Sequence, residues 1–161
     1  MELTGTHALN QPPEVVWAAL FDSEVLRDAI PGCEQLDQTG DNAFAATVKV
    51  KIGPVSARFK GEVELSEMVP PHSCLLSGKG SGGLAGFAKG SARVELVAQD
   101  GGTVLSYVAD AALGGKLASL GSRLIQSTAN KLANEFFTSF SQTLNGEAEP
   151  QPPQEPQQQI A

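Results

Sequence analysis

Residues 44–66 read FAATVKVKIGPVSARFKGEVELS, and this stretch decides the fold. Apolar and polar side chains alternate along it with a period of two, and the alternation is interrupted only at Gly53-Pro54. Successive side chains of a strand point to opposite faces, so this pattern is typical of strands with one buried face and one wet face. The stretch therefore predicts a long antiparallel hairpin that turns at Gly53-Pro54.

Upstream of the hairpin, the sequence predicts one strand and two short helices. Residues 3–9 alternate weakly, which indicates a first strand. The run Pro12-Pro13-Glu14 favours a helix start, because proline in the first turn lacks only an N–H that would have no partner there. We expect helices over 15–21 and 23–29, the second ending before Pro31.

Downstream of the hairpin, alternation predicts strands over 74–77, 87–98 and 104–112. Residues 116–144 carry an apolar stripe at three- and four-residue steps, which predicts one long helix. This order is that of a helix-grip fold in the α+β class, with a curved antiparallel sheet of six or seven strands around the C-terminal helix. We expect one domain over 1–145 and, since residues 146–161 are rich in Pro and Gln, a disordered tail there.

The composition argues against several classes of function. The chain has 161 residues and a formal charge of −7, and it contains no run of Lys and Arg, so nucleic acid is not an expected partner and anionic headgroups are disfavoured. Cys33 and Cys74 are far apart and lack metal-ligand spacing, so we expect no metal site, and no catalytic residues are predicted. The sequence contains neither a signal-like start nor an apolar run long enough to cross a membrane, which predicts a cytoplasmic protein.

Many residues expected to fill the space between the sheet and the last helix are small. They include Ala46, Ala57, Gly61, Ala92, Gly121 and Ser127. An underfilled core costs about 24 cal/mol per Å³ of empty volume, so a void there suggests a ligand, although larger neighbours could instead close the gap. The expected cavity lining is His7, Phe44, Val48, Phe59, Val63, Phe87, Val94, Tyr107, Leu120 and Leu124. His7 and Tyr107 are interpreted either as hydrogen-bond donors to a ligand or as ordinary packing residues.

A glycine-rich stretch, Gly78 to Gly83, matches the spacing of a dinucleotide-binding motif. A strand rather than a helix is expected after it, so no helix N-terminus could receive a pyrophosphate. The stretch is interpreted as a flexible hairpin loop. The expected docking or rim residues are Ile30, Pro31, Gly32, Leu84 and Gly86.

Six stretches carry a family resemblance. They are PEVVWAAL at 13–20, IPGCE at 30–34, VKVKIGPV at 48–55, FKG at 59–61, GFAKG at 86–90 and GKLASLGSRLI at 115–125. In combination they resemble the G-subunit family of carbon monoxide dehydrogenase, within the START-like or SRPBCC superfamily. The resemblance covers residues 1 to about 144.

The resemblance implies an accessory protein of an aerobic molybdenum-containing carbon monoxide dehydrogenase or a related molybdenum hydroxylase, and not a catalytic subunit. It implies peripheral association with the inner face of the cytoplasmic membrane and a hydrophobic small molecule in the cavity. Our hypothesis is a bound respiratory quinone, menaquinone or ubiquinone, or another lipid, with no covalent cofactor. The alternatives are a docking adaptor without a ligand and a small enzyme acting on a hydrophobic substrate.

Overall fold

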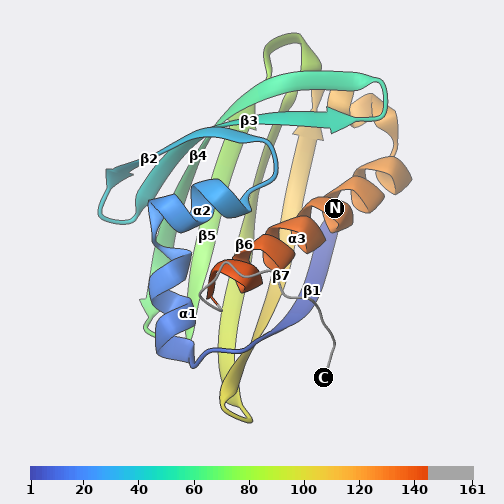
Figure 1. Cartoon of the computed structure of the whole chain (residues 1–161). Helices are drawn as coiled ribbons and strands as arrows, with labels where there is room; N and C mark the ends of the chain where they lie inside the picture. Colours follow the sequence, from blue (N-terminus) through green and yellow to red (C-terminus); the bar gives the residue numbers. More distant parts are fainter. Residues whose placement is uncertain (145–161) are drawn as a thin grey trace.

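The computed structural model describes residues 1–144, and the predicted tail over 146–161 lies outside the described residues. A seven-stranded antiparallel sheet, in the order β1-β7-β6-β5-β4-β3-β2, curves around a long C-terminal helix (Figure 1). The strands are β1 (Glu2–Leu9), β2 (Cys33–Gly40), β3 (Ala43–Ile52), β4 (Val55–Val69), β5 (Ser73–Ser81), β6 (Phe87–Gln99) and β7 (Gly102–Gly114). The helices are α1 (Pro13–Leu20), α2 (Ser23–Ala29) and α3 (Ser122–Leu144), with short 3₁₀ helices η1 (Gly83–Ala85) and η2 (Gly115–Leu120). This confirms the predicted helix-grip fold class.

The hairpin of β3 and β4 forms as its alternation predicts. Ladder pairing runs without a shift from Ala43 opposite Glu64 to Ile52 opposite Val55. Gly53 closes the turn with φ 57°, a left-handed conformation that glycine adopts without a steric penalty. In Figure 1 this hairpin curls over the start of α3.

Two parts of the sheet differ from the prediction. The edge strand β2 was not predicted, since Leu36 is its only fully buried residue and most of the others are exposed and polar. Strand β5 continues through Gly78 to Ser81, where a loop was predicted, and Gly80 pairs with Ala88 in the β5–β6 ladder. Ladder hydrogen bonds are made by the backbone, so a glycine-rich segment can pair even though its residues have low strand propensity.

The C-terminal helix begins later than predicted. Residues 116–120 belong to η2, and Gly121 with φ 91° separates this segment from α3 at Ser122. α3 then runs unbroken to Leu144, across the inner face of the sheet (Figure 1). None of the helices in residues 1–144 combines the length and the apolar character needed to span a bilayer.

The core lies at the end of the molecule where α3 finishes. Phe140, Leu105 and Val16 are at most 1% exposed and join the C-terminal part of α3 to β7 and α1. The Thr103 hydroxyl donates to the Gln11 carbonyl over 2.6 Å, and the Gln11 amide donates to the Leu144 carbonyl over 3.0 Å. These bonds hold the end of α3 against the strand and the loop beneath it.

Candidate functional site

A cavity of about 700 Å³ lies between the inner face of the sheet and α3. Strands β2 to β7 supply most of its wall, and α1, α2 and the segment after α2 close one side. The lining residues from the helices and their flanking segments are Leu20, Phe21, Leu26, Ile30, Ala133, Phe136 and Phe137. The elements that define the fold therefore also enclose the cavity.

The void exists because the centre of the inner face carries almost no side-chain volume. One row across four strands consists only of small residues, and the next two rows add more of them. These lining residues are Ala46, Gly61, Gly80, Ala88, Gly78, Gly90, Ala111, Ala92 and Ala109. Larger side chains at these positions would fill the space, so the sequence itself keeps the cavity open.

The side chains that point into the cavity are apolar except at two positions, and the other polar lining residues border it from the outward phase of their strands: Glu62, Lys79, Lys89, Ser91 and Asp110. The Tyr107 hydroxyl and the Cys74 thiol are the polar side-chain groups that the described inner-face residues contribute to the lining. Burial raises the pKa of the Cys74 thiol, so it stays neutral. The Tyr107 ring lies over Gly5 of β1, which has no side chain to displace it. A Cβ atom added to Gly5 would be only 2.6 Å from the Tyr107 hydroxyl oxygen. A guest of this cavity is therefore expected to be hydrophobic with at most a small polar group.

Six predicted cavity residues do line the cavity. They are Phe44, Val48, Phe59, Val63, Val94 and Tyr107. All six lie on strands in the inward phase of the alternation. Val63 is 38% exposed although it faces inward, because it borders the cavity rather than a packed neighbour.

The prediction placed His7 in the lining, and the structure places it beside the cavity instead. Its ring stacks on Phe137 of α3 with centroids 3.9 Å apart and an interplanar angle of 20°. Desolvation by burial lowers the pKa of His7. His7 is therefore a neutral packing residue between β1 and α3.

Phe87, Leu120 and Leu124 were also predicted to line the cavity and do not. Phe87 belongs to the outward phase of β6 and is 51% exposed, with its ring against Gly114. Leu120 lies in η2, ahead of the break at Gly121. Leu124 packs against the β3–β4 turn, where its Cδ2 is 2.9 Å from the position of a Cβ on Gly53.

The predicted rim residues have different surroundings. Ile30 faces inward and lines the cavity, Pro31 is half-buried, and the Gly32 carbonyl accepts a hydrogen bond from the Lys49 N–H over 2.8 Å. Gly86 is buried against the Gly114 carbonyl, so it is not a surface contact. Leu84 is 88% exposed at the tip of the β5–β6 loop and is the one among them that projects freely.

Sequence reasoning missed the helical part of the lining. Leu20, Phe21 and Leu26 were assigned to helices but not to the cavity, and Phe136 was placed only on the apolar stripe of the last helix. Apolar periodicity identifies the buried face of a helix, but it does not distinguish a face that meets the core from one that borders a void.

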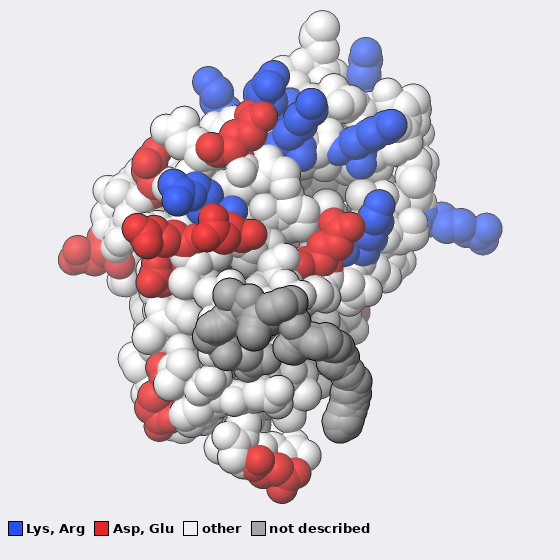
Figure 2. Space-filling model, in the orientation of Figure 1, with Lys and Arg blue, Asp and Glu red and all other residues white. Residues whose placement is uncertain are grey.

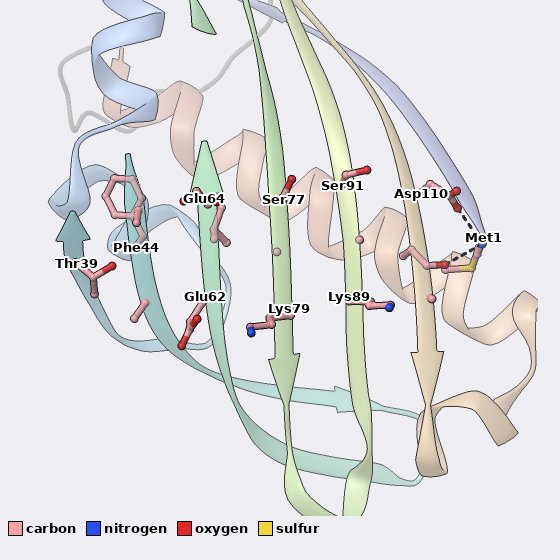
Figure 3. A pocket seen from close by; sticks show the side chains of 17 residues that line it. Met1, Thr39, Phe44, Glu62, Glu64, Ser77, Lys79, Lys89, Ser91 and Asp110 are labelled. Carbon is pink, nitrogen blue, oxygen red and sulfur yellow. Dashed lines mark hydrogen bonds and ion pairs between the residues drawn. The ribbon is translucent and has the colours of Figure 1, made fainter. Parts of the chain in front are cut away.

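A second hollow, of about 920 Å³, lies on the outer face of the sheet. Apart from Phe44, which belongs to the inward phase of β3, the side chains labelled in Figure 3 lie on the side of the strands away from α3. The ladder places Glu62 opposite Lys79 and Lys79 opposite Lys89, and the Met1 amino group donates to Asp110 over 3.3 Å at one margin. Several charged side chains line this groove, and it shares Gly78 and Gly90 with the wall of the inner cavity. Among residues 1–144, no three His, Cys, Asp or Glu side chains gather as they would around a metal ion.

Solved structures share the architecture of this chain. A conserved protein from Geobacillus kaustophilus is similar over 90% of this chain and 95% of its own, with 28% identity and a TM-score of 0.84. A START superfamily protein from Mycobacterium smegmatis covers 89% of this chain and 97% of its own, with 12% identity and a TM-score of 0.67. The Zhui aromatase/cyclase from Streptomyces sp. R1128 covers 92% and 99%, with 12% identity and a TM-score of 0.63. The fold is that of the START superfamily, and an enzyme is among the proteins that share it.

The sequence profile of the carbon monoxide dehydrogenase G-subunit family, CoxG, matches residues 5–145. The chain belongs to this family, as the resemblance of its six stretches predicted. A comparison with curated proteins gives no significant match.

Proposed function

We propose that this chain is a non-enzymatic accessory protein of an aerobic molybdenum carbon monoxide dehydrogenase. In this proposal it binds a respiratory quinone or a similar lipid in its cavity and links the enzyme to the quinone pool of the membrane. Membership of the CoxG family supports the association with the dehydrogenase. The observation that supports a bound ligand is the apolar cavity of about 700 Å³, which glycines and alanines keep open.

The size and lining of the cavity suit a prenylated ring. Pockets that hold small organic ligands typically have volumes of about 300–1,000 Å³ and are mostly apolar with a few polar groups. Each buried CH₂ contributes roughly 0.8 kcal/mol, so a few isoprene units suffice for stable binding. The Tyr107 hydroxyl can donate a hydrogen bond to a quinone carbonyl oxygen. A purely hydrocarbon guest has no such acceptor.

The same features support a carrier rather than a catalyst. His7 is stacked between β1 and α3, and the Cys74 thiol is kept neutral by burial. No side-chain hydrogen bond within residues 1–144 joins Tyr107 to a titratable group that could take or supply its proton in a reaction. The transfer of electrons is therefore assigned to the dehydrogenase, and this chain supplies a dry site for the acceptor.

Native mass spectrometry of the full chain, purified from cells that make quinones, tests whether the cavity holds a ligand. The proposal expects a bound mass that organic extraction identifies as menaquinone, ubiquinone or another prenyl or acyl lipid. The ligand-binding part of the proposal is rejected if the purified protein carries no such mass and takes up neither quinone nor fatty acid when these are added. Only the docking role would then remain. The link to the membrane is tested by carbon monoxide-dependent reduction of quinone in vesicles, which should rise when the chain is added to the purified dehydrogenase.

A further inference from the structure

The fold divides the charge of this acidic chain very unevenly. Three segments, residues 49–60, 79–89 and 114–123, contain eight of its 11 Lys and Arg and none of its 18 Asp and Glu. The cations are Lys49, Lys51, Arg58, Lys60, Lys79, Lys89, Lys116 and Arg123. We call the region formed by these three segments the basic end. Each segment contributes only a few cations, so the sequence shows no run of them, and the expectation that anionic headgroups are disfavoured rested on that missing run.

Contacts between the three segments show that the basic end is one region of the structure. The Phe59 ring lies over Gly82, with Cε1 2.7 Å from the position of a Cβ there. A Cβ on Gly115 would lie 2.6 Å from the Gly86 Cα. Figure 1 shows the β3–β4 turn, the β5–β6 loop and η2 together in the upper part of the molecule, and Figure 2 shows Lys and Arg gathered there.

Most of these cations have no acidic partner. Arg58 pairs with Glu34 of β2 over 2.7 Å. The other seven make no ion pair within 4.0 Å to any residue in the described range 1–144. Lys79 and Lys89 lie directly opposite one another on neighbouring strands, and Glu62, opposite Lys79 on β4, is the nearby acidic residue, though it makes no ion pair within 4.0 Å in the same range.

An apolar tip projects from this basic surface. Leu84 is 88% exposed, more than any other large apolar side chain of the described residues, and Phe87 beside it is 51% exposed. Both belong to the β5–β6 loop region, which forms the uppermost tip in Figure 1. Gly83, next to Leu84, has φ 63° and open space around its Cβ position, so the loop packs loosely at this point.

We infer that the basic end docks on an anionic lipid bilayer, with Leu84 and Phe87 inserted among the headgroups. Basic residues near an anionic membrane each contribute about 1 kcal/mol, and an amphipathic surface gains further from burying its apolar side chains. An acidic protein partner would meet the same cations, but it would leave the projecting leucine without an apolar environment. The bilayer accounts for both features together, so it is the partner that we assign.

This inference rests on the proposed function and adds to it the end of the molecule that faces the membrane. Gly80 and Ala88 line the cavity, and they bracket the loop that bears Leu84. Phe59 also lines the cavity and touches this loop at Gly82. Docking by the basic end therefore brings one end of the cavity next to the lipid. A hydrophobic guest can enter the cavity at that end without crossing water.

Vesicle flotation with the full chain tests the inference. Phosphatidylcholine vesicles with and without phosphatidylglycerol are compared at low salt and in about 1 M salt, where the Debye length is about 3 Å. Binding is expected only with phosphatidylglycerol and only at low salt. Leu84→Ser should weaken it about tenfold. The triple variant Lys51→Gln, Lys116→Gln, Arg123→Gln should weaken it about fivefold for each charge removed.

Matched controls lie elsewhere on the molecule. Val97→Ser removes an apolar side chain that is 59% exposed, near the opposite end of β6, and Arg27→Gln removes a cation from α2. Both should bind vesicles like the unmodified chain. All altered side chains are exposed, so thermal unfolding should be nearly unchanged in every variant.

Three results would overturn the inference. They are no binding to anionic vesicles, equal binding by the basic-end variants and the controls, and salt-sensitive binding to the purified dehydrogenase in the absence of any binding to vesicles. Because none of the altered residues lines the cavity, native mass spectrometry of the same variants separates the two proposals. An unmodified chain that carries ligand but does not dock counts against the basic end only, and an empty cavity in a chain that docks counts against the proposed carrier only.

Discussion

The substitution Ala92→Phe tests whether the cavity holds the ligand. Ala92 lies in the middle of β6, opposite Leu76 of β5 and Ala109 of β7, and all three residues line the cavity. A phenylalanine ring at this position points into the void and takes up roughly the space of one isoprene unit of a guest. The ligand must then leave one unit outside the cavity or shift away from its preferred position.

The expected changes in affinity and stability have opposite signs. One isoprene unit has five carbons, so its exclusion costs up to ~4 kcal/mol of binding free energy at ~0.8 kcal/mol per carbon. That cost corresponds to nearly three orders of magnitude in Kd. Filling the void should meanwhile raise the free energy of unfolding of the empty protein, by about 2 kcal/mol for each ~100 Å³ filled without strain.

Tryptophan fluorescence provides the assay. The chain contains one tryptophan, Trp17, whose ring lies 4.8 Å from that of Phe21, a cavity residue. Quinone bound in the cavity should quench this fluorescence, so titration with a short-chain quinone gives Kd directly. Ala8→Phe on the exposed outer face of β1 is the matched control and should leave Kd unchanged.

The reasoning fails if folded Ala92→Phe protein binds quinone with the Kd of the unmodified chain. A large fall in stability without any change in Kd would also contradict it, since the ring would then be straining a packed core. Thermal unfolding of the ligand-free variant is therefore measured alongside each titration.

Three further predictions follow from single residues. Tyr107→Phe should weaken quinone binding by about 0.5–1.5 kcal/mol, as expected for one lost hydrogen bond, while the affinity for a hydrocarbon probe without a carbonyl stays the same in parallel titrations. Gly86→Ala should destabilise the fold by at least about 1–3 kcal/mol, because φ is 119° and the new methyl would meet a neighbouring carbonyl, whereas Gly83→Ala with φ 63° has open space and should cost less in urea unfolding. Burial lowers the pKa of His7, so the unfolded chain binds the extra proton more readily and stability should fall as pH drops below 6.5. His7→Phe keeps the stacked ring and should lose less stability between about pH 7.5 and about pH 5.5, and an equal loss in both proteins would exclude this group as the cause.

The strands that were predicted well are those with one clearly buried face. In β3 and β4 every second side chain is apolar over ten or more residues, and the ladder follows that alternation. β2 gave no such signal, because it lies at the sheet edge with only Leu36 fully buried. The glycines of β5 predicted a loop, because glycine has low strand propensity. The segment is nevertheless a strand, since its backbone pairs with β6.

The same reasoning explains which cavity residues could be predicted. Inward phase identified Phe44, Val48 and Phe59, which lie in the lining. Leu124 satisfied the apolar stripe of α3 equally well, yet it packs on Gly53 because the β3–β4 hairpin curls over the start of the helix. The curl is a tertiary feature and the break at Gly121 is a local change of backbone conformation, and the spacing of apolar residues along one helix contains no information about either.

The glycines shared by the two hollows leave a partition only one backbone thick between an oily interior and a charged exterior. An added methyl group would make only ordinary contacts at the shared Gly78 and at Gly80 of the inner wall, with nearest atoms at 3.4 and 3.5 Å, whereas at the shared Gly90 the Asp110 carbonyl blocks one. Point replacements at the first two positions would therefore shorten the chamber by single carbons without refolding the barrier. On the proposed function, such replacements would change the length of prenyl chain that fits while the overall shape stays the same.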